Sequence, residues 1–118
     1  MKKYLILGGN GFIGSHLVRE LSKYNQVVVA DMVPLSGYQL NSNVEFKYLN
    51  FVKKKDFLPY LHGIDTIIHL VFTVLPAVGT SDINCEIEQN IFPTITLLDD
   101  MVKMGIRKII FISSGGTV

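Results

Sequence analysis

The stretch Tyr4-Leu5-Ile6-Leu7-Gly8-Gly9-Asn10-Gly11-Phe12-Ile13-Gly14 decides the fold of this chain. Four residues suited to a buried strand lead directly into a glycine turn, and an amphipathic segment begins at Phe12. The glycines fit both G-x-G-x-x-G and the related G-x-x-G-x-x-G. A strand, a glycine turn and a helix in this order bring bare backbone N–H groups to a helix N-terminus, where a pyrophosphate is favoured. Glycines also cluster in ordinary tight turns, so other residues must support this interpretation.

One acidic residue supports it. The segment from Gln26 to Ala30 reads as a buried strand, and Asp31 stands at its carboxyl end. In a dinucleotide-binding βαβ unit, an acidic residue about 20 positions after the glycines accepts hydrogen bonds from the adenosine ribose hydroxyls. A carboxylate there would repel a 2′-phosphate, and Met32-Val33-Pro34 offers no Arg or Lys, so the sequence predicts NAD rather than NADP. The alternative is that Asp31 only caps a turn after the strand.

Length and composition restrict the classes of function. The chain has 118 residues, enough for one domain with a core, and 48% of them are hydrophobic. A net charge of +1 with 18% charged residues gives no sign of a nucleic-acid or membrane partner. Cys85 is the single cysteine, so we expect no disulfide and no metal site, and a reducing, cytoplasmic location. No segment reads as a signal peptide or a transmembrane helix.

Strands and helices alternate along the chain, which predicts an α/β fold with a parallel sheet. Further strands are expected at 44–49, 65–71 and 108–112, with a short helical turn at 56–61. Right-handed crossovers and a change of direction after the first strand give a Rossmann-type doubly wound sheet of strand order 3-2-1-4-5. The third strand would be a half-exposed edge, and the fifth a very apolar, unpaired edge.

A long helix is expected from near Ser81-Asp82 to Met104, with Gly105 as its C-cap. Pro93 lies inside it, so the helix either kinks there or begins anew. We favour a kinked, continuous helix, because apolar residues hold one face across the proline: Ile87, Ile91, Ile95, Leu98 and Val102.

The most reactive side chains have ordinary structural explanations. His69 lies within the apolar fourth strand and is interpreted as a core histidine rather than a base. His16 and His62 read as surface residues. Cys85 is interpreted as a small apolar filler.

With these elements in place, the chain resembles the NAD-dependent epimerase/dehydratase family of extended short-chain dehydrogenases/reductases, and within it most the UDP-glucose 4-epimerases and their relatives. The resemblance covers essentially all of the chain. It rests on segments in matching order: Gly8–Leu17, Asp31, Asp65–Leu70, Asn90-Ile91 with Thr94 and Leu97-Leu98, Gly105–Lys108, and Ser113–Val118. It implies that residues 1–118 form the NAD-binding Rossmann domain, incomplete here, of an enzyme that acts on nucleotide sugars, with UDP-sugars the expected partners.

The resemblance also assigns residues to the cofactor: Gly8, Gly11, Phe12, Ile13, Gly14, Asp31, Asn50, Phe51, Leu70, Val71 and Asn90. Phe12 and Ile13 would offer backbone N–H groups to the pyrophosphate while their side chains pack inward. Asn50-Phe51 would contact adenine, although the family usually has an aspartate in place of the asparagine. Leu70-Val71 would line the ribose and nicotinamide, and Asn90 would touch the cofactor or the loop after the fourth strand.

The catalytic groups implied by the resemblance are only partly present. The family uses a tyrosine base with a lysine four positions later, and a serine or threonine after the fifth strand that hydrogen-bonds the reacting hydroxyl. Ser114 takes the hydroxyl role, with Thr117 as the alternative, unless both serines after that strand merely bond turn backbone. None of the tyrosines has a lysine four places later.

We therefore expect the amino-terminal part of a longer enzyme, inactive by itself and without the carboxyl-terminal substrate-binding region and the last strands of the sheet. The alternative is a non-catalytic NAD-sensing regulatory module of the same fold. The particular sugar, the reaction type within the family and the oligomeric state, including a homodimer, stay open.

Overall fold

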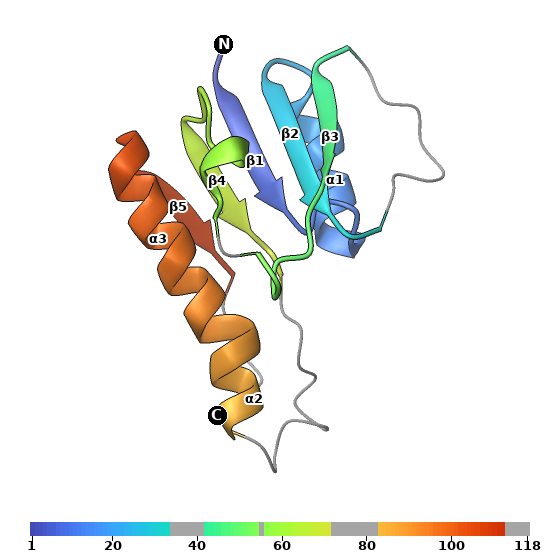
Figure 1. Ribbon diagram of the computed structural model, residues 1–118. Coiled ribbons are helices and arrows are strands. Elements are labelled where there is room, and N and C mark those ends of the chain that lie inside the picture. The colour runs from blue at the N-terminus through green and yellow to red at the C-terminus, as the bar shows by residue number, and fades with distance from the viewer. Residues whose placement is uncertain (34–41, 55, 72–82, 113–118) are drawn as a thin grey trace.

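The computed structural model describes residues 1–33, 42–54, 56–71 and 83–112. They contain a five-stranded parallel sheet in the order β3-β2-β1-β4-β5 (Figure 1). The strands are β1 (Lys3–Leu7), β2 (Gln26–Asp31), β3 (Val44–Tyr48), β4 (Thr66–His69) and β5 (Lys108–Phe111). The predicted Rossmann-like α/β class and strand order are therefore confirmed. β4 ends two residues earlier than predicted, because the chain leaves the ladder after His69.

The sheet is covered on both faces. Helix α1 (Phe12–Leu21) packs on one face, while the 3₁₀ turn η1 (Leu58–Tyr60) and the long helix lie on the other (Figure 1). Alternate strand residues supply the two cores, as the two-residue period of a strand requires. Leu5 and Leu7 face the long helix, whereas Ile6 packs with Val18 of α1. The edge strands β3 and β5 are more exposed than β1, β2 and β4, as the sequence predicted.

The long helix runs without a break through α2 (Ile83–Glu86), the π-helical segment η3 (Ile87–Ile91) and α3 (Phe92–Met104). A continuous helix is therefore confirmed for residues 83–104, while its predicted start at 81–82 lies outside the described residues. The irregularity is the π-helical turn η3 just before Pro93, which is where the residue without a backbone N–H interrupts the regular helical bonding. Gly105 has φ +73° and closes the helix as the predicted C-cap. No helix among the described residues is long and apolar enough to cross a membrane.

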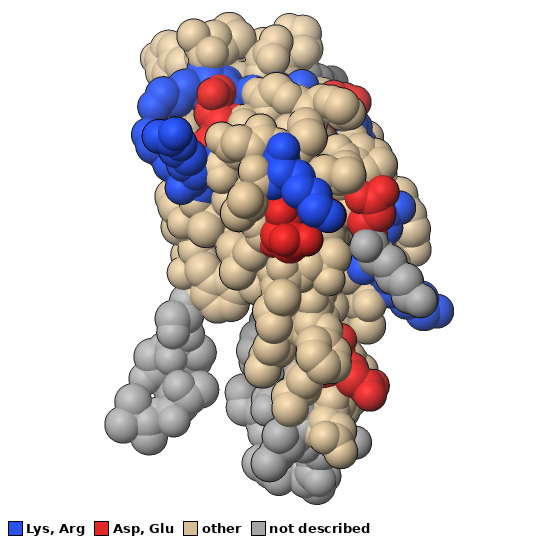
Figure 2. Space-filling model, turned by 60° about the vertical axis from the view of Figure 1, so that its left-hand side comes forward, with Lys and Arg blue, Asp and Glu red and all other residues tan. Residues whose placement is uncertain are grey.

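The apolar stripe on this helix does hold one face, but that face is exposed. Ile95 is 54% exposed and Val102 78% exposed, and the residues that face the sheet are Pro93, Leu97, Asp100 and Met101. Figure 2 brings this side of the molecule forward and shows a broad area without charged side chains below a charged upper region. The helix therefore has one apolar side on the core and a second in contact with solvent.

Candidate functional site

The glycine turn follows β1 at the carboxyl edge of the sheet. Gly8 has φ +79°, a left-handed conformation that favours glycine, and its N–H donates to the carbonyl of Ala30 at 2.8 Å. The Gly11 N–H donates back to the carbonyl of Gly8 at 3.1 Å. The first bond holds the turn against the end of β2, and the second closes the turn just before the start of α1.

Gly14 and Gly11 are glycines for different reasons. A Cβ on Gly14 would lie 2.6 Å from the Gly8 oxygen and 2.7 Å from the Gly9 Cα, so only glycine lets α1 approach the turn this closely. Gly11 has φ −75°, and the nearest atom to its Cβ position is the Gly8 oxygen at 3.4 Å. The packing does not require glycine at position 11. A Cβ there would make an ordinary van der Waals contact with the Gly8 oxygen, at the N-terminus of α1 where a ligand would approach.

The N-terminus of α1 offers free donors. Gly11 is the N-cap, no side chain caps the helix, and its first turn holds no acidic residue. The first backbone N–H groups of a helix have no acceptor within the helix. Together with the positive end of the helix dipole, they suit an anion such as a phosphate.

The side chains of Phe12 and Ile13 do not pack inward, contrary to the prediction. Phe12 is 83% exposed and Ile13 53% exposed. The helical period of 3.6 residues explains this, because it places Phe12 on the side of α1 opposite Gly14 and Val18. The Phe12 ring instead lies edge-on to His16, with centroids 5.1 Å apart. Their backbone N–H groups still lie in the first turn of α1.

Asp31 lies beside the glycine turn. Its Oδ2 accepts the backbone N–H of Asn10 at 3.0 Å, and its Oδ1 accepts that of Val33 at 3.2 Å. The Asn10 amide in turn donates to the Val33 carbonyl. The carboxylate therefore caps the turn after β2, as the alternative interpretation had it, and also borders the proposed phosphate site. Each oxygen retains a lone pair that could accept a ribose hydroxyl.

The residues after β4 form the other wall of the glycine turn. Leu70 donates its N–H to the carbonyl of Leu7 at 3.0 Å. A Cβ on Gly8 would lie 3.4 Å from both the Leu70 carbonyl carbon and Val71 Cγ2. The structure thus brings the glycine turn, Asp31 and Leu70-Val71 together at the carboxyl edge, the edge at which doubly wound sheets bind ligands.

Asn50 and Phe51 lie in the turn after β3. The Asn50 carbonyl accepts the Lys54 N–H at 3.1 Å, and its Oδ1 accepts that of Lys53 at 3.4 Å. The Phe51 side chain is only 3% exposed and packs against Phe57 and His69, so it has only its backbone to offer to a ligand. These two residues are positioned by the core rather than by the glycine turn.

Asn90 lies in the π-helical turn η3 and connects to β4 through two other side chains. The Thr94 hydroxyl donates to the Asn90 carbonyl at 2.6 Å and lies 3.2 Å from Nε2 of His69. His69 is 2% exposed, which confirms the prediction of a core histidine, and burial lowers its pKa to about 4.

Comparisons with known proteins point to one family. The model of the NAD dependent epimerase/dehydratase family matches residues 4–118. The chain belongs to this family. The UDP-glucose 4-epimerase of Neisseria meningitidis serogroup C is 33% identical over 97% of this chain and 37% of its own length. The dTDP-4-dehydro-6-deoxyglucose reductase of Escherichia coli is 29% identical over 97% of this chain and 39% of its own.

Solved structures of the family have the same fold. The UDP-glucose 4-epimerase of Thermotoga maritima, solved with UDP-glucose, is 30% identical and superimposes with a TM-score of 0.79 over 97% of this chain and 38% of its own. The chain therefore spans little more than a third of the length of the relatives that it matches.

Two features of this family member were not foreseen from its sequence. Thr94 had no assigned role, and His69 was expected only to fill the core, yet the two side chains join β4 to the long helix. The spacing of Thr94 four residues after Asn90 was a usable signal, since a helical threonine commonly donates to the carbonyl four residues earlier. The predicted catalytic Ser114 and its alternative Thr117 lie outside the described residues.

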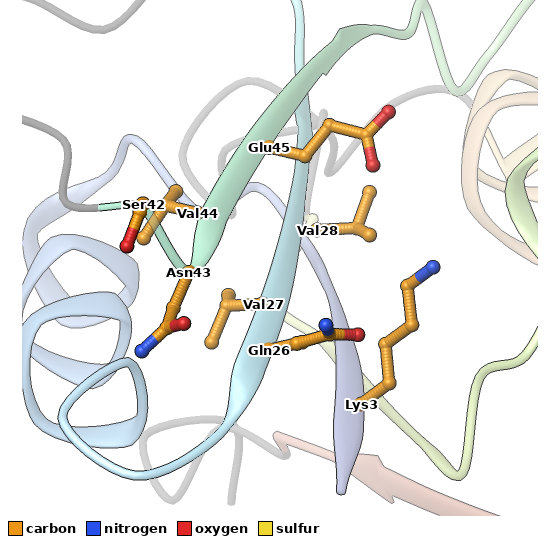
Figure 3. Close-up of a pocket in the computed structure, with 8 residues that line it drawn as sticks. All are labelled: Lys3, Gln26, Val27, Val28, Ser42, Asn43, Val44 and Glu45. Carbon is orange, nitrogen blue, oxygen red and sulfur yellow. The ribbon is translucent and has the colours of Figure 1, made fainter. Parts of the chain in front are cut away.

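A surface hollow of about 200 Å³ lies elsewhere on the sheet (Figure 3). Lys3 and Gln26 in its lining are the first residues of β1 and β2, so the hollow is at the amino ends of the strands. Open α/β sheets of this kind bind ligands at the opposite, carboxyl edge. We therefore assign the hollow no part in the cofactor site.

Proposed function

We propose that this chain is the NAD-binding portion of a nucleotide-sugar epimerase or dehydratase. The single observation that carries this proposal is the uncapped N-terminus of α1, which directly follows a glycine turn that is held by the carboxylate of Asp31. Membership of the NAD-dependent epimerase/dehydratase family supports it. A bound NAD would supply hydride chemistry, the removal and return of a hydride at a sugar carbon that carries a hydroxyl group.

The residues of the chain would bind and orient the cofactor. The N–H groups of Phe12 and Ile13 would bind the diphosphate, which the missing Cβ of Gly11 allows to approach. Asp31 would accept bonds from the adenosine ribose hydroxyls and repel the 2′-phosphate of NADP. Leu70-Val71 would exclude water from the side of the cofactor that faces β4. These roles predict a preference for NAD.

Three further residues and a backbone segment extend this proposal to adenine, the residues after β4 and the substrate. Asn50 and the Phe51 backbone would contact adenine, and Asn90 would contact the cofactor or the residues after β4. Ser114 would hydrogen-bond the reacting sugar hydroxyl. Because the 118 residues contain no Tyr-x-x-x-Lys, we propose that they perform no turnover by themselves.

The substrate and assembly of the full-length enzyme are proposals as well. Structural relatives were solved with UDP-glucose and with UDP-N-acetylmuramic acid, which favours a UDP-sugar as the substrate. The exposed apolar stripe on the long helix favours a homodimer, and the single cysteine favours a cytoplasmic location.

A non-catalytic NAD-sensing module remains the second candidate, favoured by the same lack of Tyr-x-x-x-Lys. It shares the cofactor site and differs in chemistry. An assay of the complete open reading frame with UDP-glucose and other UDP-sugars separates the two, since turnover is expected only of the enzyme.

Calorimetric titration with NAD and NADP tests the cofactor site. We expect NAD to bind, and NADP to bind at least about tenfold more weakly because of Asp31.

Gly11→Val should abolish binding, because its side chain fills the space at the N-terminus of α1. His62→Ala, at an exposed position outside the site, is the matched control and should bind NAD as the wild type does. Failure of the wild type to bind either nucleotide would refute the proposal.

A further inference from the structure

His69 lies where several segments of the candidate site meet. It is the last residue of β4, and its ring contacts Phe51 of the turn after β3, with centroids 4.8 Å apart. On another side it contacts Phe111, the last residue of β5, at 5.0 Å. Both contacts are edge-on, an arrangement that aromatic rings prefer. The ring therefore touches the turn after β3 and the end of β5 at once.

The hydrogen bonds of this ring have a defined direction. The Val71 backbone N–H can only donate, so Nδ1 of His69, 3.2 Å away, must be the unprotonated acceptor. Nε2 then carries the hydrogen and donates to Oγ1 of Thr94 at 3.2 Å. The Thr94 hydroxyl passes the bond on to the Asn90 carbonyl at 2.6 Å. One neutral tautomer thus makes all three hydrogen bonds in the series from the Val71 N–H to the Asn90 carbonyl possible.

A protonated ring would break this chain of bonds. It would place an N–H on Nδ1 opposite the N–H of Val71, so that two donors would face one another. The described groups in contact with the ring are aromatic rings, a hydroxyl and backbone, and none carries a charge that could stabilise an imidazolium. The low pKa of His69 agrees with this geometry.

The bond to Val71 fixes a segment that has just left the sheet. Leu70 is still held by Leu7, but the Val71 N–H has no strand to bond. Val71 Cγ2 is 3.4 Å from the position of a Cβ on Gly8, the first glycine of the turn. A displacement of Val71 would therefore change the space beside the turn that we assign to the cofactor.

We propose that His69, as the neutral Nε2–H tautomer, is a positioning residue that ties the end of β4 to the long helix through Thr94 and thereby sets the wall of the cofactor site beside Gly8. The proposal rests on the proposed NAD site and goes beyond it. In this role His69 acts through Val71 on one side and through Thr94 and Asn90 on the other.

Two variants remove hydrogen bonds of the His69–Thr94 pair while they keep a side chain of similar shape. His69→Phe retains a ring for Phe51 and Phe111 but loses both hydrogen bonds, and Thr94→Val removes only the hydroxyl. We expect each to weaken NAD affinity about tenfold, with the double variant no weaker than His69→Phe alone, because both act on one chain of bonds. Thr94→Ser keeps the hydroxyl and should restore affinity to within about twofold of the wild type. His62→Phe, the same change at an exposed histidine, is the control.

A merely structural role predicts different results. In that case the variants would lower the unfolding temperature, while the folded fraction would bind NAD with unchanged affinity, or the effects of His69→Phe and Thr94→Val would be additive. Either result overturns the proposal. If His69→Phe does not fold, Thr94→Val and Thr94→Ser still decide between the two roles.

Nitrogen NMR of the imidazole tests the tautomer directly. We expect hydrogen on Nε2 and none on Nδ1 at neutral pH, and an Nδ1-protonated ring would overturn the proposal. If the wild type binds no NAD, the proposed function fails, and the positioning role is then judged on the amide resonances of Leu70 and Val71. His69→Phe and Thr94→Val should both shift these resonances and Thr94→Ser should leave them in place, whereas unmoved resonances would refute it.

Discussion

The backbone N–H of Asn10 donates to Oδ2 of Asp31 over 3.0 Å, which joins the glycine turn to the end of β2. The acid that we expect to bind the ribose therefore also holds the turn that we expect to bind the diphosphate. A substitution at Asp31 is expected to affect the shape of the turn as well as the recognition of the ribose.

Asp31→Asn should weaken NAD binding and reduce the preference for NAD over NADP. The amide removes the negative charge that repels a 2′-phosphate, yet its oxygen can still accept one of the two backbone N–H groups. We expect the ratio of the NADP to the NAD dissociation constant to fall about tenfold, measured by calorimetry. Asp65→Asn, at the amino end of β4, is the control. An unchanged ratio would show that Asp31 serves only as a turn cap.

Gly14→Ala and Gly11→Ala should affect different properties, the first the stability of the fold and the second the affinity for NAD. At Gly14 the new Cβ meets backbone at 2.6 Å, so α1 must shift, and we expect a loss of about 2 kcal/mol in the free energy of unfolding. At Gly11 the nearest atom is 3.4 Å away, so stability should stay within about 0.5 kcal/mol of the wild type while NAD affinity falls. Urea unfolding and calorimetry measure the two effects. Equal losses of stability in both variants would contradict the assignment of Gly11 to the ligand.

Burial of His69 should make stability depend on pH. Its pKa falls from 6.5 to about 4 in the folded chain, so the unfolded chain takes up the proton first as the pH drops. The free energy of unfolding therefore keeps its full value above pH 6.5 and falls as the pH drops toward 4. The loss that is due to His69 amounts to about 3 kcal/mol. Urea unfolding between pH 7 and pH 4.5 should show this slope in the wild type.

His69→Phe isolates this contribution. Carboxylates also titrate in acid, so the wild-type curve alone does not identify the histidine. The difference in unfolding free energy between the wild type and His69→Phe should shrink as the pH falls from 6.5 toward 4. Parallel curves for the two proteins would show that His69 is not buried as a neutral ring.

Asp100 and Asp99 are adjacent on α3 but should differ in their effect on stability. Oδ2 of Asp100 accepts the buried Phe57 N–H at 2.8 Å, and the Asp100 side chain is 6% exposed. Asp100→Ala leaves that N–H without its acceptor and should cost about 2 kcal/mol. Asp99 is 68% exposed and pairs with Lys103, so Asp99→Ala should cost less than about 0.5 kcal/mol. Thermal and urea unfolding check both, and similar losses would disprove the anchoring of η1 by Asp100.

The exposed stripe on the long helix should control self-association. Val102 is 78% exposed on the same face as Ile95, and a charge there would stay solvated in a monomer but would be buried in a dimer. We expect Val102→Glu to shift a dimer to a monomer in sedimentation velocity. Tyr24→Glu, at a residue that is 79% exposed near the end of α1, is the control and should not. A dimer that persists in Val102→Glu would exclude this face as the interface.

The order and type of the secondary-structure elements followed from local patterns. A strand shows a period of two residues and a helix a period of 3.6, while Pro93 restricts the backbone and Gly105 permits the left-handed conformation that ends a helix. The right-handed crossover rule then left few strand orders to consider. These are properties of short segments or of the chain as a whole, so they could be predicted before any contact was known.

The sequence by itself determined the parallel sheet, the glycine turn and the membership of a family. Tertiary structure alone decided which apolar side of α3 meets the core, that Asp100 accepts the Phe57 N–H, and that His69 bonds Thr94. The physical reason is that these outcomes depend on partners distant in sequence: Phe57 and Asp100 lie 43 positions apart and Asn10 and Asp31 lie 21 apart. Periodicity shows that a helix has an apolar side, but only the assembled sheet shows which of two such sides it buries.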